Sequence, residues 1–269
     1  MVVDFHTHIF PDKIALSTVG ALQEKSNNNP YSDGTANGLI EKMLEAGVQI
    51  SINLPVMTKP TQFDSMLNFV NETNSRFSSQ NVKIISFMGI HPNCQDIPSK
   101  MKKIKESGIL GVKIHPDYQS TYIDDDGYIE ILKCAKDNDL IVVTHSGIDD
   151  GYKNFPERCP PELVKRVIDV VGHSKFVLGH YGAHKQWEET LNILAGKDVF
   201  FDTAVTLPKI SEELFVKIAE KHGYDKILFA TDSPWGDARE DVLKLKSFNI
   251  SEENLQKILY KNALKLLGL

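Results

Sequence analysis

Short apolar runs recur along the chain, and each ends in polar or turn-forming residues. Most are rich in Val, Ile and Phe, as expected for strands that are buried on both faces of a sheet. Eight such runs predict strands: Val2 to His8, Val48 to Pro55, Val82 to His91, Ile109 to His115, Leu140 to His145, Lys175 to His180, Val199 to Ala204 and Ile227 to Asp232.

The segments between these runs have the apolar spacing of helices, and several carry end signals such as Gly47 and Gly172 after the last turn and Ser211 before the first. Parallel strands joined by helical crossovers form either a closed barrel or an open doubly wound sheet. The count of eight favours the barrel. We therefore predict an α/β protein, a (β/α)8 TIM barrel, as a single domain over residues 1–269.

Three other segments carry expectations of their own. The irregular stretches Asn27 to Thr35 and Ser146 to Arg158 are expected to be loops over an active site. Leu255 to Leu267 has the spacing of a final amphipathic helix. This helix packs either on the barrel or on a second subunit. Whether the protein is a homo-oligomer therefore stays open.

Composition excludes some functions. The formal net charge of -6 provides no clustered basic surface for nucleic acid or an anionic membrane. No apolar run approaches the roughly 18 residues that a membrane span needs. Cys94, Cys134 and Cys159 are odd in number and widely scattered, which argues for a reducing compartment. We expect a cytoplasmic protein with a small-molecule substrate.

Histidines fall at the ends of the predicted strands, where a barrel brings distant residues together. His6 and His8 are two apart on an extended strand, so both side chains can point at one metal ion. Each of three later strands ends in a further candidate ligand, and these are His145, His180 and Asp232. One such residue could be a hydrogen-bonded core residue, but their joint placement predicts a divalent metal site.

The order of these residues resembles the amidohydrolase superfamily. The opening Asp-Phe-His-Thr-His-Ile-Phe-Pro and the later Gly-His-Tyr-Gly are similar to its amidohydrolase-2 branch, which includes metal-dependent decarboxylases. Met-Gly-Ile-His-Pro and Thr-Asp-Ser-Pro resemble TatD-type metal-dependent hydrolases. The resemblance implies that His6, His8 and Asp232 bind a first metal ion, while His145 and His180 bind a second ion or complete the first site.

The resemblance also implies catalytic roles. Asp232 would take a proton from the attacking water, and we count His180 with it as a catalytic candidate. Zinc is the metal that we expect first, as one or two ions, with manganese, iron or nickel as alternatives.

Strand 4 departs from the TatD-type pattern, because Gly-Val-Lys-Ile-His-Pro stands where those enzymes have a bridging Glu. Lys113 is placed like a lysine that carbon dioxide carboxylates in other branches, and it would then be a metal ligand. As a plain ammonium it would instead bind a substrate anion or pair with Asp232. The number of metal ions therefore stays open.

Several residues are candidates for substrate binding, each with a structural alternative. His91 and His115 face the substrate or pack behind the ligands, and Arg158 with Lys153 forms an anion clamp or stays solvated. Tyr181, Trp235 and Trp187 line the pocket or belong to the core. Of the remaining histidines, His184 is expected to support His180, whereas His173 and His222 are expected at the surface. The substrate-binding set is His91, Lys113, His115, Arg158, Tyr181 and Trp235.

Three functions fit these residues. The first is hydrolysis of a small amide, ester, lactone or phosphoester by metal-activated water. The second is nonoxidative decarboxylation of a small aromatic or unsaturated acid, and the third is a noncatalytic metal-binding barrel. Lys113, His91 and His115 favour hydrolysis, because the decarboxylases that the branch includes do not typically carry Lys-Ile-His-Pro.

Overall fold

The computed structural model describes residues 1–77, 82–152 and 155–269. All paired strands are parallel and lie in two sheets with the orders β1-β2-β3 and β4-β5-β6-β7-β8-β9. Their bounds are β1 (Val3–Thr7), β2 (Ile50–Asn53), β3 (Lys83–Ser86), β4 (Met88–Gly89), β5 (Gly111–Ile114), β6 (Ile141–Thr144), β7 (Phe176–Leu178), β8 (Phe200–Asp202) and β9 (Ile227–Leu228).

The predicted strand from Val82 to His91 is divided at Phe87. Its first half, β3, pairs with β2, whereas its second half, β4, pairs with β5. The backbone N–H of Phe87 donates to the carbonyl of Asn53 at 2.9 Å, so the chain passes directly from one sheet into the other. The strand predicted from the sequence thus takes one place in the barrel, but its two halves pair in different sheets.

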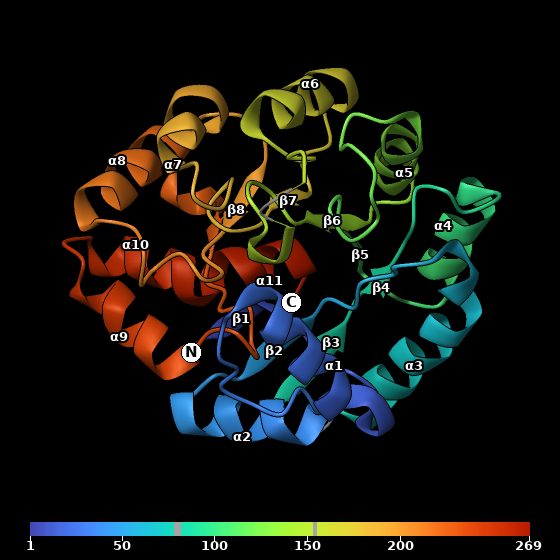
Figure 1. Ribbon diagram of the computed structural model, residues 1–269. Coiled ribbons are helices and arrows are strands. Elements are labelled where there is room, and N and C mark those ends of the chain that lie inside the picture. Colours follow the sequence, from blue (N-terminus) through green and yellow to red (C-terminus); the bar gives the residue numbers. More distant parts are fainter. Residues whose placement is uncertain (78–81, 153–154) are drawn as a thin grey trace.

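The strands surround a central axis, with helices outside them (Figure 1). Between β9 and β1, the N–H of Phe5 donates to the carbonyl of Phe229 at 2.9 Å, and Thr7 forms an isolated parallel bridge with Ser233. Among the described residues these contacts do not form a continuous ladder. The predicted TIM-barrel fold is therefore confirmed as a parallel α/β arrangement whose ring of hydrogen bonds is not closed.

Helices follow the strands as the sequence predicts. Gly47 and Gly172 end helices in the left-handed conformation, with φ of 69° and 57°, and the Ser211 side chain accepts from the N–H of Leu214. The helix bounds are α1 (Asp12–Ser26), α2 (Ala36–Ala46), α3 (Phe63–Arg76), α4 (Ile97–Glu106), α5 (Asp126–Asp137), α6 (Pro161–Val171), α7 (Trp187–Glu189), α8 (Glu212–His222), α9 (Ala238–Ser247), α10 (Glu252–Gln256) and α11 (Asn262–Leu267).

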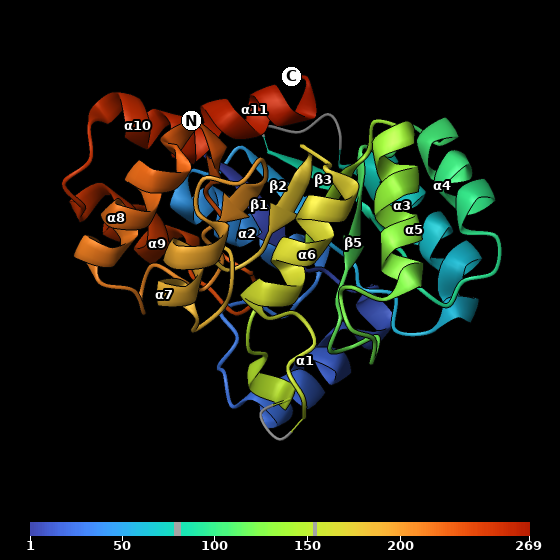
Figure 2. The same ribbon diagram turned by 90° about the horizontal axis from the view of Figure 1, so that it is seen from above.

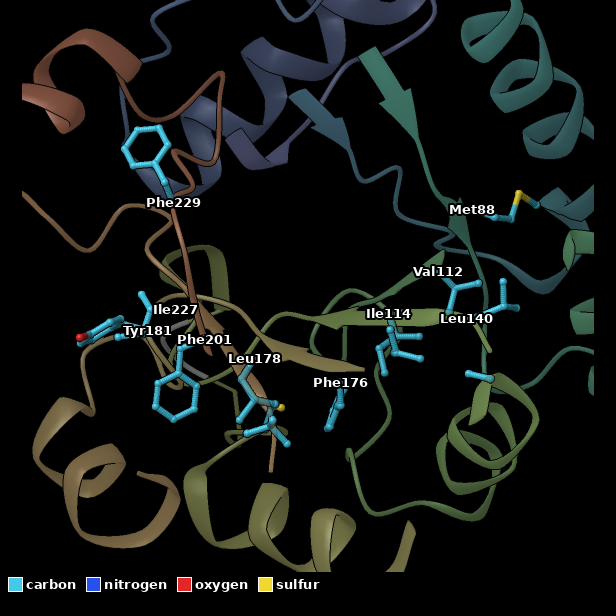
Figure 3. Close-up of a cluster of buried hydrophobic side chains, with 14 of the residues drawn as sticks. Met88, Val112, Ile114, Leu140, Phe176, Leu178, Tyr181, Phe201, Ile227 and Phe229 are labelled. Carbon is cyan, nitrogen blue, oxygen red and sulfur yellow. The ribbon is translucent and has the colours of Figure 1, made fainter. Parts of the chain in front are cut away.

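Alternating strand residues divide the core in two. Val112, Ile114, Phe176 and Leu178 point away from the axis toward the surrounding helices (Figure 3). Phe5, Ile52, Phe87, Val143 and Val177 belong to a second buried cluster that fills the barrel interior. Burial on both faces explains why the strands read as continuous apolar runs.

The two ends of the barrel are covered differently. α1 lies with the loop after β6 at one end, and α10 and α11 lie at the other (Figure 2). Leu266 and Leu267 of α11 join the interior cluster. The C-terminal segment therefore packs on the barrel of its own chain. No helix in the described ranges is both long and apolar enough to cross a membrane.

The expectation that His173 and His222 lie at the surface is wrong. His173 is buried, with Nε2 2.8 Å from the carbonyl of Leu140. His222 is also buried, and its ring stacks on Phe201 with centroids 3.7 Å apart. His222 continues the apolar face of α8, whose buried residues recur at helical spacing, and this explains its position.

Candidate metal centre and substrate pocket

The carboxyl ends of the strands open into one cavity of about 540 Å³. Loop residues from both expected segments also line it, including Asn28, Ile148 and Asp149. The sequence-predicted residues that line it are His6, His8, Lys113, His115, His145, His180, Asp232 and Trp235. The structure thus gathers residues from strands that are far apart in the sequence.

An irregularity in β1 places His6 and His8 in this cavity. The register with β2 shifts between Asp4 and Thr7. Val3 and Phe5 belong to the interior cluster, and strict alternation would then turn His6 outward. Because the register shifts, both Phe5 and His6 face the interior, and His8 follows on the same side.

His6, His8 and Asp232 form a group with the spacing of metal ligands. Oδ1 of Asp232 lies 3.4 Å from Nε2 of His6 and 3.0 Å from Nε2 of His8. Two ligand atoms with bonds of about 2.1 Å to one cation are roughly 3.0 to 3.4 Å apart at octahedral or tetrahedral angles. The three residues therefore fit a divalent cation.

In His6 and His8, the ring nitrogen Nδ1, which is not the one near Asp232, lies within hydrogen-bond distance of an oxygen atom. Nδ1 of His6 lies 2.8 Å from Oδ2 of Asp202, and Nδ1 of His8 lies 2.8 Å from the carbonyl of Leu54. In each ring, a proton on Nδ1 leaves the lone pair of Nε2 facing Asp232. Such contacts fix the tautomer and orientation of a metal-binding imidazole.

His180 and His145 continue the cluster. Nδ1 of His145 lies 2.9 Å from Nε2 of His180, whose own Nδ1 is 3.1 Å from the carbonyl of Ala204. His145 also belongs to a second ligand-like group, with His115 and Asp149. The five predicted ligands are therefore adjacent, but they do not form one group.

Two candidate site residues that follow strands, His180 and Asp232, have a left-handed backbone conformation. His180 has φ of 60° and Asp232 has φ of 68°. Residues other than glycine rarely adopt this conformation, although Asp and His do so more readily than most. Such conformations gather at functional sites, where the surrounding structure maintains them.

The buried histidines are neutral at neutral pH. Burial lowers the pKa of His6, His115 and His145 well below 6.5 and that of His180 to about 4. Neutral imidazoles have the lone pairs that a cation requires. Burial alone would raise the pKa of Asp232, but the nearby His6 and His8 outweigh it and lower the pKa. This carboxylate is therefore ionised.

Lys113 is buried at the base of the cavity, with Nζ 3.0 Å from Nε2 of His6. Burial lowers its pKa to about 8, while Asp232 and Asp202 oppose that effect. The side chain is thus an ammonium at neutral pH that deprotonates more readily than an exposed lysine. Carboxylation of Lys113 stays a prediction.

The structure does not bring the remaining candidates together at the cavity. Nδ1 of His91 accepts from the N–H of Asn93, and Arg158 donates to Asp117 at 3.4 Å. Neither His91 nor Arg158 is among the residues lining the cavity. Lys153 lies outside the described residues.

Tyr181 lies in the core instead of the pocket. Its ring stacks on Phe215 with centroids 4.5 Å apart, and its hydroxyl donates to the carbonyl of Phe215. Figure 3 shows Tyr181 on the outer side of the strands. Trp187 packs against the core from a half-buried position, and its indole N–H donates to the carbonyl of His180. His184, by contrast, lines the cavity and contacts the His180 ring.

Sequence reasoning missed Asp202, Asp149 and the apolar wall of the pocket. Asp202 ends β8, so the strand-end signal that identified the histidines could have found it. Asp149 follows β6 in a loop and had no comparable signal. The apolar wall comes mainly from α1, α3 and the loops after β1 and β2, with Ile9, Phe10, Ile14, Leu22, Val56, Met66 and Phe69.

Comparison with protein families identifies the family of the chain. The profile of the amidohydrolase family (Amidohydro_2) matches residues 3–269. The chain belongs to this family. As an enzyme of the amidohydrolase superfamily, it carries the candidate divalent metal site described above. A search of curated proteins finds no match, and the TatD-type features stay a resemblance.

Solved structures match this amidohydrolase over nearly its whole length. An uncharacterized TIM-barrel protein from Bordetella bronchiseptica has a TM-score of 0.76 at 16% identity, covering 99% of this chain and 98% of its own. A 5-carboxyvanillate decarboxylase from Novosphingobium aromaticivorans, complexed with manganese, has a TM-score of 0.74 at 13% identity, covering 100% and 96%. A 2,6-dihydroxybenzoate decarboxylase from Rhizobium has a TM-score of 0.68 at 15% identity, covering 99% and 98%. At these identities the likeness concerns the fold.

Proposed function

We propose that this amidohydrolase catalyses the metal-dependent, nonoxidative decarboxylation of a small aromatic or unsaturated acid. The observation that carries the proposal is the division of the cavity lining between charged and polar residues at the strand ends and apolar residues from α1, α3 and the loops after β1 and β2. An acid with a flat apolar body fits this division, with its carboxylate at the base. The similar solved structures include decarboxylases of aromatic acids, which supports the same reading.

The His6, His8 and Asp232 group would hold the divalent cation, for which manganese is a candidate because a similar structure is complexed with it. When bound, the cation supplies positive charge that holds the substrate carboxylate and disperses negative charge. With a cation on Nε2 of His6, that nitrogen could not also accept from Lys113, and the Lys113 ammonium would be free to face the cavity. It then provides a second positive contact for the carboxylate.

Lys113 is also our proposed proton donor. As the bond between the carboxylate and the substrate carbon breaks, carbon dioxide leaves and the electron pair stays on that carbon. A proton from Nζ of Lys113 then forms the new C–H bond, and solvent restores the ammonium. Burial lowers the pKa of Lys113, which makes its proton easier to transfer than that of an exposed lysine.

The apolar residues of the cavity lining would orient the substrate. Phe10, Val56 and Phe69 offer a surface for an unsaturated ring, and Trp235, which follows Asp232 after Ser233 and Pro234, also lines the cavity. A ring that fills the cavity would exclude water, which strengthens the charge interactions at the strand ends. Water exclusion favours decarboxylation over hydrolysis.

Hydrolysis, the first expectation from the sequence, becomes the alternative. The ionised Asp232 beside His6 and His8 would also suit a water-activating base. The apolar wall and the similar decarboxylase structures favour the lyase reading instead.

Product analysis distinguishes these reactions. Protein reconstituted with Mn²⁺ is incubated with hydroxybenzoic acids in D₂O, and carbon dioxide and deuterium in the product are measured by mass spectrometry. A parallel panel holds amides, esters, lactones and phosphoesters. We expect carbon dioxide release with one deuterium at the vacated carbon, and its loss in Asp232→Asn. Turnover confined to the second panel would contradict the proposal.

A further inference from the structure

The cavity offers more space than an aromatic ring and its carboxylate require. Its volume is about 540 Å³. A cavity of about 150 Å³ is enough to hold benzene, and cavities of about 300 to 1,000 Å³ bury drug-sized ligands. A hydroxybenzoic acid would therefore leave much of the cavity to water or to a further part of the substrate.

Helix α1 borders the cavity along one of its faces. The lining residues of α1 recur at every fourth position, which places them on one side of the helix, and they are Ile14, Thr18, Leu22 and Ser26. At 1.5 Å per residue, this face runs for about 18 Å. Ala15 and Val19 are buried on the neighbouring face, whereas Ile14 is 49% exposed. α1 thus buries one face and turns another, partly apolar face to the cavity.

Helix α3 contributes a second apolar face. Met66 and Phe69 lie three residues apart on α3 and line the same cavity, together with Val56 from the loop after β2. Apart from histidines, the charged residues of the described lining lie in or after β5, β6, β8 and β9, and they are Lys113, Asp149, Asp150, Lys209 and Asp232. Both helices therefore contribute only uncharged groups to the described lining.

Polar side chains in this part of the lining have local partners. The Ser26 hydroxyl donates to the carbonyl of Leu22 at 2.9 Å, and the Ser65 hydroxyl donates to the carbonyl of Gln62 at 3.0 Å. Oε1 of Gln62 in turn accepts the N–H of Thr58 at 2.9 Å. An apolar group placed against these residues would leave these hydrogen bonds intact. It would thus avoid the cost of leaving these groups buried and unpaired.

We propose that the substrate carries an apolar substituent of several carbon atoms on its ring, and that this substituent lies between the lining faces of α1 and α3. The inference rests on the proposed function, which puts the carboxylate at the strand ends. The helix faces line the same cavity as that site, so one molecule can contact both. An apolar chain gains free energy from burial there, whereas a charged substituent would lose hydration without an opposite charge from either helix.

Binding of dead-end analogues tests the substituent separately from the reaction. Two series of 2-hydroxybenzenesulfonates, with n-alkyl groups from methyl to heptyl at ring position 4 or 5, cannot release carbon dioxide. Each analogue is titrated into full-length protein with Mn²⁺ by calorimetry. In at least one series, Kd should fall on the order of two- to fourfold for each methylene added between methyl and pentyl. Affinity that does not rise with chain length in either series would overturn the proposal.

Variants of α1 locate the chain. Ile14→Asn and Leu22→Asn change the face that lines the cavity, and each should weaken binding of the pentyl analogue about threefold or more while leaving the methyl analogue within about twofold of wild type. Leu16→Asn is the matched control, because Leu16 lies on the same helix, is 73% exposed and does not line the cavity. It should leave both affinities unchanged. Equal effects in all three variants would overturn the proposed position of the chain.

Carbon dioxide release from the matching carboxylic acids separates the two proposals. Release from the methyl acid, without tighter binding of the longer analogues, would support the reaction and overturn the substituent. Tighter binding of the longer analogues, without release from any of the acids, would support the site for the substituent and contradict the decarboxylation.

Discussion

The carboxylate of Asp202 lies 2.8 Å from Nδ1 of His6 and thereby sets the face that His6 presents to the cavity. Its other oxygen accepts the backbone N–H groups of His180 and Ala204. One buried carboxylate therefore positions the imidazole of a candidate metal ligand and the backbone of a neighbouring candidate site residue.

We expect Asp202→Asn to weaken binding of Mn²⁺ about 10- to 100-fold, as is typical when the partner of a metal-binding histidine is changed. An amide has only one acceptor oxygen, so it cannot satisfy both His6 and the two backbone N–H groups. Chelator competition measures the affinity. Asp198→Asn removes an exposed carboxylate near the same strand and should leave affinity unchanged. Equal affinity in Asp202→Asn and the wild type would refute this role.

Tyr181→Phe should reduce the free energy of unfolding by about 1 to 3 kcal/mol, because the buried carbonyl of Phe215 loses its partner. Metal affinity should not change, since Tyr181 does not line the cavity. Denaturant unfolding and metal titration measure the two quantities. Tyr118 lines the cavity, so Tyr118→Phe serves as the comparison variant for both measurements. Weakened substrate binding without loss of stability in Tyr181→Phe would instead support the sequence-based expectation that Tyr181 binds the substrate.

Asp241 should make the protein less stable as pH rises. Burial raises its pKa from 3.8 to about 8, with Asp4 adding to the effect, so the folded protein retains a proton that the unfolded chain releases. The stabilisation is complete below about pH 4 and is lost as pH rises through about 8. Asp241→Asn removes this dependence.

The melting temperature of Asp241→Asn relative to wild type should therefore be higher at pH 9 than at pH 5. Calorimetry at both pH values measures the difference. Glu240→Gln, an exposed neighbour on the same helix, should show no such trend. A difference that is equal at pH 5 and pH 9 would count against the buried, protonated carboxyl.

Two glycine substitutions should have opposite effects on stability. Gly147 has φ of 86°, and an added Cβ would lie 2.2 Å from the backbone N of His184, so Gly147→Ala should destabilise by about 1 to 3 kcal/mol. Gly20, within α1, has no atom within 4 Å of an added Cβ. Gly20→Ala should stabilise by roughly 0.5 to 1 kcal/mol. Thermal unfolding of both variants checks the signs.

The strands were predictable because burial on both faces leaves continuous apolar runs that end in recognisable polar residues. The break at Phe87 was not, because it depends on which strand each half pairs with. Partner choice is a property of the assembled sheet and leaves no local pattern. The open ladder between β9 and β1 has the same origin.

That the candidate histidines meet in one cavity was predictable, because strand ends converge on one face of a barrel. Tyr181 was placed wrongly, since it follows His180 directly but has left-handed backbone, with φ of 60°, and its side chain turns to Phe215. Asp149 is brought to His115 by a loop, whose path no periodicity reveals. Residues on strands were thus better predicted than residues that depend on chain reversals.

The placement of α1 has a consequence for how the enzyme can diversify. The N–H of Phe10 donates to the carbonyl of Gly34 at 2.8 Å, so the segment containing α1 leaves and rejoins the barrel at one point. Ile14, Thr18 and Leu22 of this segment line the cavity, whereas the candidate ligands His6 and His8 precede it. Mutations in α1 can therefore alter selectivity while the chemical centre is inherited unchanged.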